Sequence, residues 1–255
     1  MLLAIDLGNT NLTIGLYDGA ELGPHWRLST DASRMPDEYG LQLSSLLEHS
    51  HIEQHQLDGV VLSSVVPPLT SRMVEACLRY LSEDPLIISP DLKLGITIGY
   101  EDPYAVGADR IADAVAVQTY YSGPACIIDF GTATTFNALT KEGVYIGGAI
   151  TAGLGLTSEA LYAHTAKLSR VELKAPEKVI GTNTTLAMQS GLVLGYASMV
   201  SGMVERFKNE MGKETRVIAT GGLVELIAPH VPVIEIRAPW LTLDGLRILW
   251  ENNRK

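Results

Sequence analysis

The chain begins with the stretch that decides its fold, Met1-Leu-Leu-Ala-Ile-Asp-Leu-Gly-Asn-Thr-Asn-Leu-Thr-Ile-Gly-Leu-Tyr-Asp-Gly19. Residues 2–5 form a short apolar run bounded by turn residues, which predicts a buried strand ending beside Asp6. Residues 8–11 predict a polar turn, residues 12–17 alternate as a second strand, and Asp18-Gly19 is a hairpin signal. The stretch thus brings one carboxylate and several N–H and O–H donors to one edge of a sheet, as a magnesium–phosphate ligand requires.

The same pattern occurs a second time, in Cys126-Ile-Ile-Asp-Phe-Gly-Thr-Ala-Thr-Thr-Phe-Asn-Ala-Leu-Thr-Lys-Glu-Gly143. Asp129 and Gly131 take the places of Asp6 and Gly8, 123 positions further along a chain of 255 residues. A two-fold repeat at this spacing predicts two homologous domains. Two such hairpins facing each other across a cleft would bracket a polyphosphate.

Composition sets the broad class of the protein. Hydrophobic residues make up 46% of the chain and charged residues 19%, as in globular proteins. The apolar runs are far shorter than the ~18 residues of a membrane span, and no signal peptide is expected at the N-terminus. The net charge of −10 argues against a broad nucleic-acid surface. Cys77 and Cys126 are expected to be buried thiols in a reducing cytoplasm.

The rest of the chain alternates predicted strands and helices, which is typical of an α/β layer architecture. The further strands are expected at 25–29, 57–66, 86–89, 143–150, 216–220 and 231–236. The helices are expected from residue 35, and at 69–80, 107–121, 153–163, 183–211 (whole or broken) and 242–250. Three glycines of the 183–211 segment are expected at close-packing positions: Gly191, Gly195 and Gly202. The domains are expected at 1–118 and 119–255.

Asp6 and Asp129 are the first candidates for chemistry. A lone carboxylate in an apolar setting is costly unless it is paired, hydrogen-bonded or metal-bound. Either could be a turn-capping residue, but the repeated Gly and hydroxyl context favours cation or phosphate binding. Magnesium needs only one or two carboxylates besides substrate phosphates. The donors expected around the two turns are Asn9, Thr10, Asn11, Thr13, Thr132, Thr134 and Thr135.

Gly107-Ala-Asp-Arg110 is the next candidate, at the start of a predicted apolar helix. Asp109 could simply be a first-turn acid favoured by the helix dipole, with Arg110 a solvated charge. Alternatively, Asp109 is a general base near an acceptor hydroxyl, and the planar guanidinium of Arg110 binds a carboxylate. Both interpretations stay open on the residues alone.

Other motifs are weaker. Gly147-Gly148, Gly153-Leu-Gly155 and Gly221-Gly222 could pack against a nucleotide's base and ribose, or could be ordinary turns. The six histidines lack metal-ligand spacing, and neither a P-loop nor a G-x-S-x-G motif is present.

Asp6-Leu-Gly-Asn-Thr10 and Asp129-Phe-Gly-Thr-Ala133 resemble the two phosphate motifs of the actin/hexokinase/Hsp70 ATPase superfamily. With Gly107–Arg110, and with Asn183-Thr184 ahead of Met188-Gln-Ser-Gly191, the chain resembles the type III pantothenate kinases from Met1 to about Leu249. The resemblance implies a duplicated actin-like (ribonuclease H-like) α/β fold of two domains with a central cleft.

The resemblance also implies an activity, the ATP-dependent phosphorylation of pantothenate to 4'-phosphopantothenate in coenzyme A biosynthesis. It implies ATP, Mg²⁺ and a monovalent cation, K⁺ or NH₄⁺, as cofactors. It implies a cytoplasmic homodimer whose partner subunit helps to close the pantothenate site, with no nucleic-acid or membrane partner.

The resemblance assigns roles to single residues. It makes Asp109 the catalytic base, Asp129 the residue associated with the monovalent cation, and Asp6 a magnesium contact through phosphate or water. The ATP contacts it implies are Asp6, Leu7, Gly8, Asn9, Thr10, Asn11, Leu12, Thr13 and Thr132. The pantothenate contacts it implies are Tyr100, Gly107, Ala108, Asp109, Arg110 and Thr184.

The chain departs from the family pattern at two positions. Ala152 stands where the family commonly has proline, and Thr182 where it commonly has a basic residue. Two other functions remain open at this level. One is a kinase or phosphatase of the same superfamily acting on a sugar or acetate, and the other is a non-catalytic regulator such as the Bvg accessory factors. Retention of Asp6, Asp109, Arg110 and Asp129 argues against the regulator.

Overall fold

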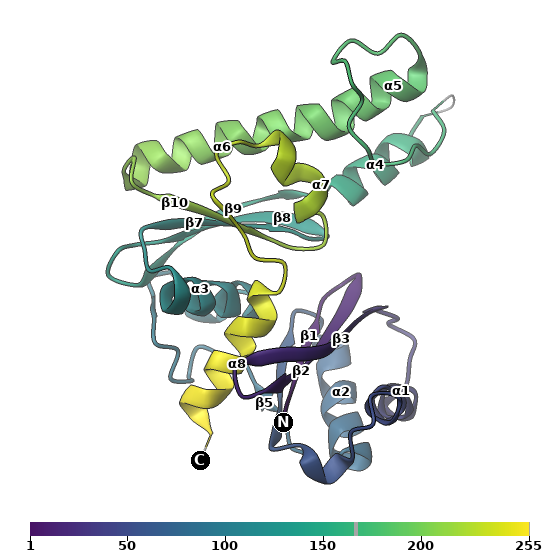
Figure 1. Cartoon of the computed structure of the whole chain (residues 1–255), viewed down its shortest axis with the longest axis vertical. Helices are drawn as coiled ribbons and strands as arrows, with labels where there is room; N and C mark the ends of the chain where they lie inside the picture. Colours follow the sequence, from purple (N-terminus) through teal and green to yellow (C-terminus); the bar gives the residue numbers. More distant parts are fainter. Residues whose placement is uncertain (166–167, 255) are drawn as a thin grey trace. The chain divides into compact units, whose positions relative to one another are not determined.

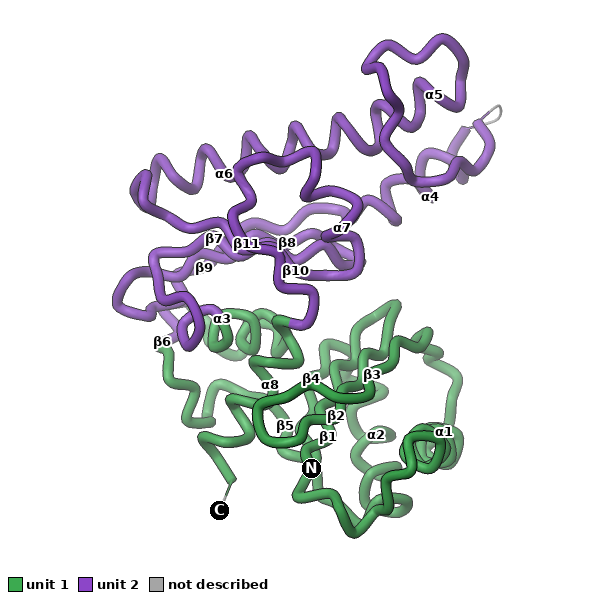
Figure 2. Tube along the Cα trace, in the orientation of Figure 1, with its two compact units in different colours: residues 1–96, 101–116, 241–255 green, residues 97–100, 117–240 purple. Residues whose placement is uncertain are grey.

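The computed structural model describes residues 1–165 and 168–254, and the chain divides into two compact units (Figures 1 and 2). Unit 1 comprises Met1–Ile96, Glu101–Ala116 and the C-terminal segment from Leu241, and unit 2 comprises Thr97–Tyr100 and Val117–Trp240. The division at 116/117 lies close to the expected boundary at 118. The last helix, which that boundary assigned to the second domain, is counted with unit 1.

Unit 1 is built on a five-stranded sheet of order β3-β2-β1-β4-β5. The strands are β1 (Leu2–Leu7), β2 (Asn11–Asp18), β3 (Glu21–Ser29), β4 (Gly59–Ser64) and β5 (Leu86–Ile87). The helices are α1 (Pro36–His49), α2 (Pro67–Tyr80), the start of α3 (Ala108–Tyr120) and α8 (Leu241–Asn253), with 3₁₀ turns at Gln54–Gln56 and Pro103–Ala105. β1 runs antiparallel to β2 and parallel to β4.

Helices cover both faces of this sheet. Leu3, Ile5 and Leu7 belong to the core shared with α1 and α2. The alternate residues of β2 meet α8, since Leu243 contacts Gly15 and Asp244 accepts a hydrogen bond from Tyr17. A strand that is buried on both faces reads as a continuous apolar run, which explains the sequence of residues 2–5.

Unit 2 repeats the arrangement on a six-stranded sheet of order β11-β10-β7-β8-β9-β6. The strands are β6 (Thr97–Ile98), β7 (Ala125–Phe130), β8 (Ala133–Leu139), β9 (Val144–Ala152), β10 (Arg216–Thr220) and β11 (Ile236–Arg237). The helices are α4 (Leu154–Ala163), α5 (Thr184–Gln189), a π segment (Ser190–Gly195), α6 (Tyr196–Met211), α7 (Val224–Ile227) and the 3₁₀ turn Ala228–His230. β7 is antiparallel to β8 and parallel to β10, as β1 is to β2 and β4. The repeat expected from the sequence is confirmed.

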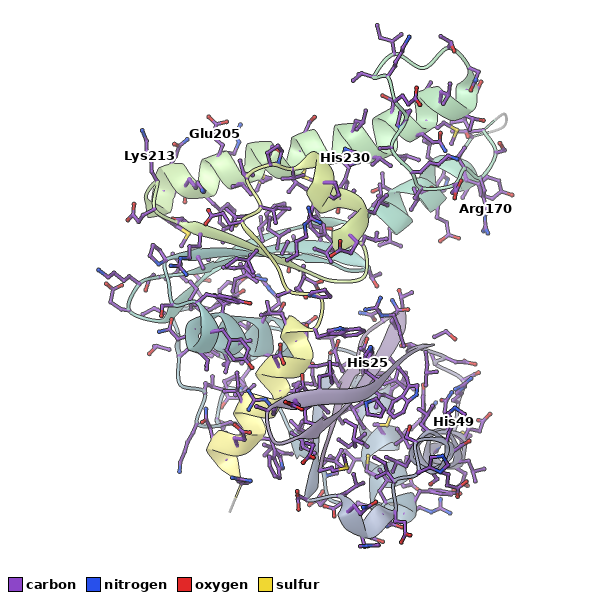
Figure 3. The ribbon with its side chains drawn as sticks, in the orientation of Figure 1. His25, His49, Arg170, Glu205, Lys213 and His230 are labelled. Atoms are coloured by element: carbon purple, nitrogen blue, oxygen red, sulfur yellow. The ribbon has the colours of Figure 1, made fainter. Side chains whose placement is uncertain are left out.

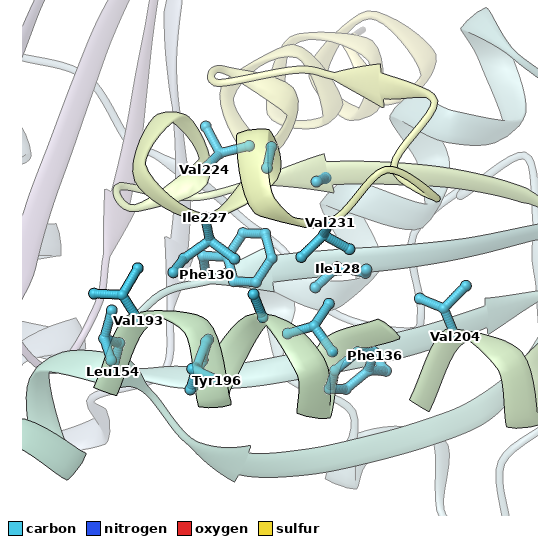
Figure 4. Packing of buried hydrophobic residues seen from close by; sticks show 14 of the residues in the cluster. Ile128, Phe130, Phe136, Leu154, Val193, Tyr196, Val204, Val224, Ile227 and Val231 are labelled. Atoms are coloured by element: carbon cyan, nitrogen blue, oxygen red, sulfur yellow. The ribbon is translucent and has the colours of Figure 1, made fainter. Parts of the chain in front are cut away.

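The core of unit 2 lies between the sheet and its helices. Figure 4 shows Phe130 and Phe136 of the sheet packed among Tyr196 of α6 and Ile227 of α7. Burying each large apolar side chain of this kind contributes about 1.5–3 kcal/mol. This core fixes the end of β7, where Asp129 lies.

The 183–211 segment, expected as a whole or a broken helix, is one helical run with a π segment at Ser190–Gly195. Other sequence predictions need correction. Beyond its chain neighbours and its own helix, an added Cβ on Gly191, Gly195 or Gly202 would meet no atom of the described residues within 4 Å, so close packing at these glycines is wrong for this chain. The strand expected at 231–236 is only Ile236–Arg237, because Ile234 donates to the Val231 carbonyl in a turn. The helix expected from Leu69 begins two residues earlier, at Pro67, because the first turn of a helix favours proline.

No helix in residues 1–165 and 168–254 combines the length and the hydrophobicity needed to cross a bilayer.

The contact between α8 and α3 gives a test of the packing in unit 1. A Cβ on Gly245 of α8 would lie 2.0 Å from the Ala112 carbonyl oxygen of α3. Gly245→Ala should therefore lower the free energy of unfolding by about 1–3 kcal/mol, despite the higher helix propensity of alanine. Urea titration followed by circular dichroism measures this change.

Gly202→Ala is the matched control, since Gly202 also lies within a helix but an added Cβ there meets open space. This variant should be as stable as the parent chain or more stable. A midpoint for Gly245→Ala that equals or exceeds that of Gly202→Ala contradicts the packing described.

Candidate active site

Asp6 is held at the carboxyl edge of the unit 1 sheet. Its register partners are Thr13 on β2 and Ser63 on β4. The Ser63 hydroxyl donates to Asp6 Oδ1 at 2.9 Å. Ile5 and Leu7, which flank Asp6 in the chain, are fully buried, so the strand cannot move without disrupting the core. A carboxylate is thereby fixed at the point where the chain turns.

The turn that follows is closed by backbone contacts and held by Thr30. The Gly8 N–H donates to the Asn11 carbonyl at 3.0 Å. Thr30 donates its N–H to the Thr10 carbonyl at 2.9 Å and its hydroxyl to the Gly8 carbonyl at 2.7 Å. Sequence reasoning missed Thr30, because nothing local marks a partner 20 residues from the turn.

The expected ATP contacts of this hairpin differ in accessibility. Asn9, Thr10 and Asn11 are exposed on the turn. Leu7 and Leu12 are buried in the core and are register partners in the β1–β2 pair, so their side chains do not reach a ligand. The polar turn is therefore the accessible part of the hairpin.

Asp129 has the equivalent position in unit 2, at the end of β7 with Thr135 and Thr220 as register partners. A Cβ on Gly221 would lie 2.3 Å from Asp129 Oδ1, and Gly221 has φ +94°. Gly221 is thus required beside a carboxylate, which is a more specific role than either alternative left open by the sequence, nucleotide packing or an ordinary turn. The Thr132 carbonyl accepts from the Gly153 N–H at 3.0 Å, which holds this turn against the start of α4.

Two of the hydroxyls expected in the second turn serve the core. Thr134 is buried and is hydrogen-bonded to the Tyr196 hydroxyl. Thr135 accepts from the Asn137 amide at 3.0 Å. Thr132 is only partly buried.

Asp109 folds back over Gly107 at the start of α3. Its Oδ1 accepts the Arg110 N–H at 2.8 Å, and a Cβ on Gly107 would lie 2.5 Å from the same oxygen. Burial raises the pKa of Asp109, while the Arg110 N–H and guanidinium act in the opposite direction. Arg110 is itself buried, so the alternative in which it is a solvated charge is wrong. A desolvated carboxylate of this kind is a stronger base than an exposed one.

Val65 links Asp109 to the Asp6 hairpin within unit 1. The Val65 N–H donates to the Leu7 carbonyl at 3.2 Å. A Cβ on Gly107 would lie 3.5 Å from Val65 Cγ1. The Gly107–Arg110 segment therefore packs beside the strand end that carries Asp6.

The remaining predicted site residues lie in unit 2. The Tyr100 ring is 6.4 Å from that of Tyr145 and lies against Gly147. Thr184 begins α5 and is exposed, and Asn183 caps that helix by accepting the Leu186 N–H at 2.9 Å.

No group of three or more His, Cys, Asp or Glu residues able to hold a metal exists among the described residues. His25 lies on β3 and His49 at the end of α1, so these two come from different elements (Figure 3). Cation contacts through the single carboxylates of Asp6 and Asp129, together with ligand oxygens, stay a prediction.

Comparison with known proteins identifies relatives of the chain. The family model for type III pantothenate kinase matches residues 2–206. A type III pantothenate kinase of Moorella thermoacetica is 48% identical over 253 residues, covering 99% of this chain and 100% of the relative. Both findings agree with the resemblance predicted from the motifs.

Solved structures support the fold. A Campylobacter jejuni protein assigned to the Baf family of transcriptional activators aligns with a TM-score of 0.60 and 17% identity, covering 98% of this chain and 97% of that one. An inorganic polyphosphate/ATP-glucomannokinase of Arthrobacter aligns with a TM-score of 0.53 and 15% identity, covering 97% and 96%. The duplicated actin-like α/β fold class is confirmed.

The raised pKa of Asp109 predicts a pH-dependent cost in stability. The folded chain retains this proton to a higher pH than the unfolded chain, so ionisation of Asp109 lowers the free energy of unfolding as pH rises through the folded pKa. Asp109→Asn should therefore be more stable than the parent at pH 7.5, on the order of 1 kcal/mol, and the advantage should shrink as the pH falls.

Urea titrations of both chains at pH 7.5 and at pH 5 measure the difference. Asp84→Asn, at an exposed position of the same unit, should show no such gain. If Asp109→Asn is less stable than the parent chain at pH 7.5, then ionisation of Asp109 does not lower the free energy of unfolding, and the prediction is wrong.

Proposed function

Because the chain belongs to the type III pantothenate kinase family, we propose that it transfers the γ-phosphoryl group of ATP to the terminal hydroxyl of pantothenate. The product is 4'-phosphopantothenate, and the reaction is the first step of coenzyme A biosynthesis. The structural observation that carries the proposal is the contact of the Gly107–Arg110 segment with Val65, beside the end of β1. This contact places the desolvated carboxylate of Asp109 on the same side of unit 1 as the turn 8–11, which resembles a phosphate motif.

Phosphoryl transfer depends mainly on positioning and charge stabilisation. The turn 8–11 offers the exposed side chains of Asn9, Thr10 and Asn11 to ATP phosphates. Thr132 offers the corresponding hydroxyl in unit 2. Asp6, held by Ser63, would contact Mg²⁺ through water or phosphate. When bound, Mg²⁺ would neutralise charge on the phosphate oxygens.

Asp109 acts as the general base in this proposal. It accepts the proton of the pantothenate hydroxyl, and its raised pKa brings its basicity closer to the operating pH. The buried guanidinium of Arg110 holds polar groups of pantothenate, together with Tyr100, Gly107, Ala108 and Thr184. A binding module would have no use for this burial, which costs stability.

Asp129 has a separate role in the proposal, as the carboxylate beside a bound K⁺ or NH₄⁺ ion. Gly221 and Gly131 pack around its two oxygens without side chains of their own. A monovalent cation at this place would offset phosphate charge.

We also propose that the protein forms a homodimer and that it is located in the cytoplasm. Val179 and Ile180 of unit 2 are 72% and 83% exposed, which suits an interface in a homodimer. Cys77 and Cys126 are buried free thiols, the state expected in a reducing cytoplasm, and burial raises the pKa of each to about 12.

Removal of the base gives the most direct kinetic prediction. Asp109→Asn should lower kcat roughly 10²–10⁴-fold in pantothenate-dependent ADP release with ATP, Mg²⁺ and K⁺. Asp84→Asn should retain the parent rate. Turnover near normal in Asp109→Asn would rule out this base, and equal rates with hexoses or acetate in place of pantothenate would rule out the substrate.

The cation site gives a second kinetic prediction. Replacing K⁺ by Na⁺ should depress the activity of the parent chain, because the two ions differ in size. Asp129→Asn should lower the activity in K⁺ and make it insensitive to the choice of ion, whereas Asp84→Asn should respond like the parent. Identical rates of the parent chain in both salts contradict a selective site.

A further inference from the structure

Helix α8 contacts the helix that carries Asp109 through a buried acid. Asp113 lies four residues after Asp109, on the same side of α3, and is 1% exposed. The Thr242 hydroxyl in the first turn of α8 donates to Asp113 Oδ1 at 2.8 Å. A buried carboxylate needs such donors, and the N-terminal end of a helix favours a negative charge.

The backbone of α8 fits against α3 at the same place. Gly245 lies one turn after Leu241, and even a methyl group on it would overlap the carbonyl of Ala112. The Asp113–Thr242 hydrogen bond and the Gly245–Ala112 contact are adjacent on both helices. Together they define the register of α3 against α8.

The same helix also contacts β2, the strand that follows the phosphate-type turn. Asp244 Oδ1 accepts from the Tyr17 hydroxyl at 2.8 Å. Leu243 Cδ1 would lie 2.8 Å from a Cβ on Gly15. Arg247 places its guanidinium 5.9 Å from the Tyr17 ring centre and pairs with Glu251 at 2.7 Å. One C-terminal helix therefore contacts both the Asp109 helix and the Asp6 hairpin.

We propose that Asp113 and Thr242 are positioning residues for the phosphoryl transfer, because their hydrogen bond sets the register of α3 and so the place of Asp109 relative to the turn 8–11. The inference rests on the proposed role of Asp109 as the base. A displacement of about 1 Å at a reacting group can lower a rate by up to ~10²-fold. The pair therefore acts on catalysis through Asp109 and leaves the ATP turn in place.

The test begins with Thr242→Val, which has nearly the same shape but lacks the hydroxyl. We expect kcat to fall about 10–100-fold, with the KM for ATP within about two-fold of the parent. Thr242→Ser keeps the hydroxyl donor, and Asp113→Asn keeps an acceptor oxygen. Each of these two variants should therefore retain most of the parent kcat. Thr242→Ala, with the same expected loss, replaces Thr242→Val if valine prevents folding.

Tyr17→Phe is the matched control, since it removes a different hydroxyl bonded to α8, the donor to Asp244, and keeps the Asp113–Thr242 hydrogen bond. It should lower the urea midpoint without a comparable loss of kcat. If Thr242→Val and Thr242→Ala lower stability as Tyr17→Phe does and leave kcat unchanged, the pair is structural only and the inference is overturned.

A double-variant cycle separates this inference from the proposed function. If Thr242 acts through Asp109, then Asp109→Asn combined with Thr242→Val should be no slower than Asp109→Asn alone. Multiplicative losses would overturn the inference and leave the base in place. A parent-like rate for Asp109→Asn would instead overturn the proposed base, whatever Thr242 does.

Discussion

The parallel pairing of β1 with β4 is the constraint on which the site depends. Because parallel strands end at the same edge of a sheet, the pairing brings Asp6 beside Ser63 and places Val65 against the Leu7 carbonyl. Gly107 then packs on Val65, which locates Asp109. The pairing of β7 with β10 does the same in unit 2, where it brings Gly221 against Asp129.

A second feature of the molecule is the number of charged groups buried along one helix. Asp109, Arg110 and Asp113 lie within five consecutive residues of α3, and two of them are almost fully buried. Burial of such groups opposes folding unless each has partners. The fold compensates with local contacts, such as the Arg110 N–H to Asp109 and Thr242 to Asp113, and with a large apolar core around β1 and β2. The cost in stability thus accompanies a desolvated carboxylate at the position proposed for the base.

Much of the fold could be predicted from the sequence, because its signals are local. The hairpins after Asp6 and Asp129 and the start of the helix at Ala108 follow from turn residues and apolar periodicity. The supports of the site could not be predicted, since Thr30, Ser63 and Thr242 come from distant parts of the chain. The role of each glycine could not be predicted for the same reason. A Cβ on Gly221 would clash with the Asp129 carboxylate, whereas a Cβ on Gly191 would point into open space among the described residues. The length of the last strand, expected at 231–236, was overestimated. The apolar residues there first form a turn, and only Ile236–Arg237 pairs with the sheet.

The central claim is that Asp109 is the base that faces the acceptor hydroxyl. A crystal structure of the full chain with pantothenate and a non-hydrolysable ATP analogue, in Mg²⁺ and K⁺, measures this directly. We expect an Asp109 carboxylate oxygen within about 2.6–3.2 Å of the terminal hydroxyl oxygen of pantothenate, or one water away from it. A hydroxyl that instead contacts another carboxylate, with Asp109 beyond the reach of a bridging water, would contradict the account.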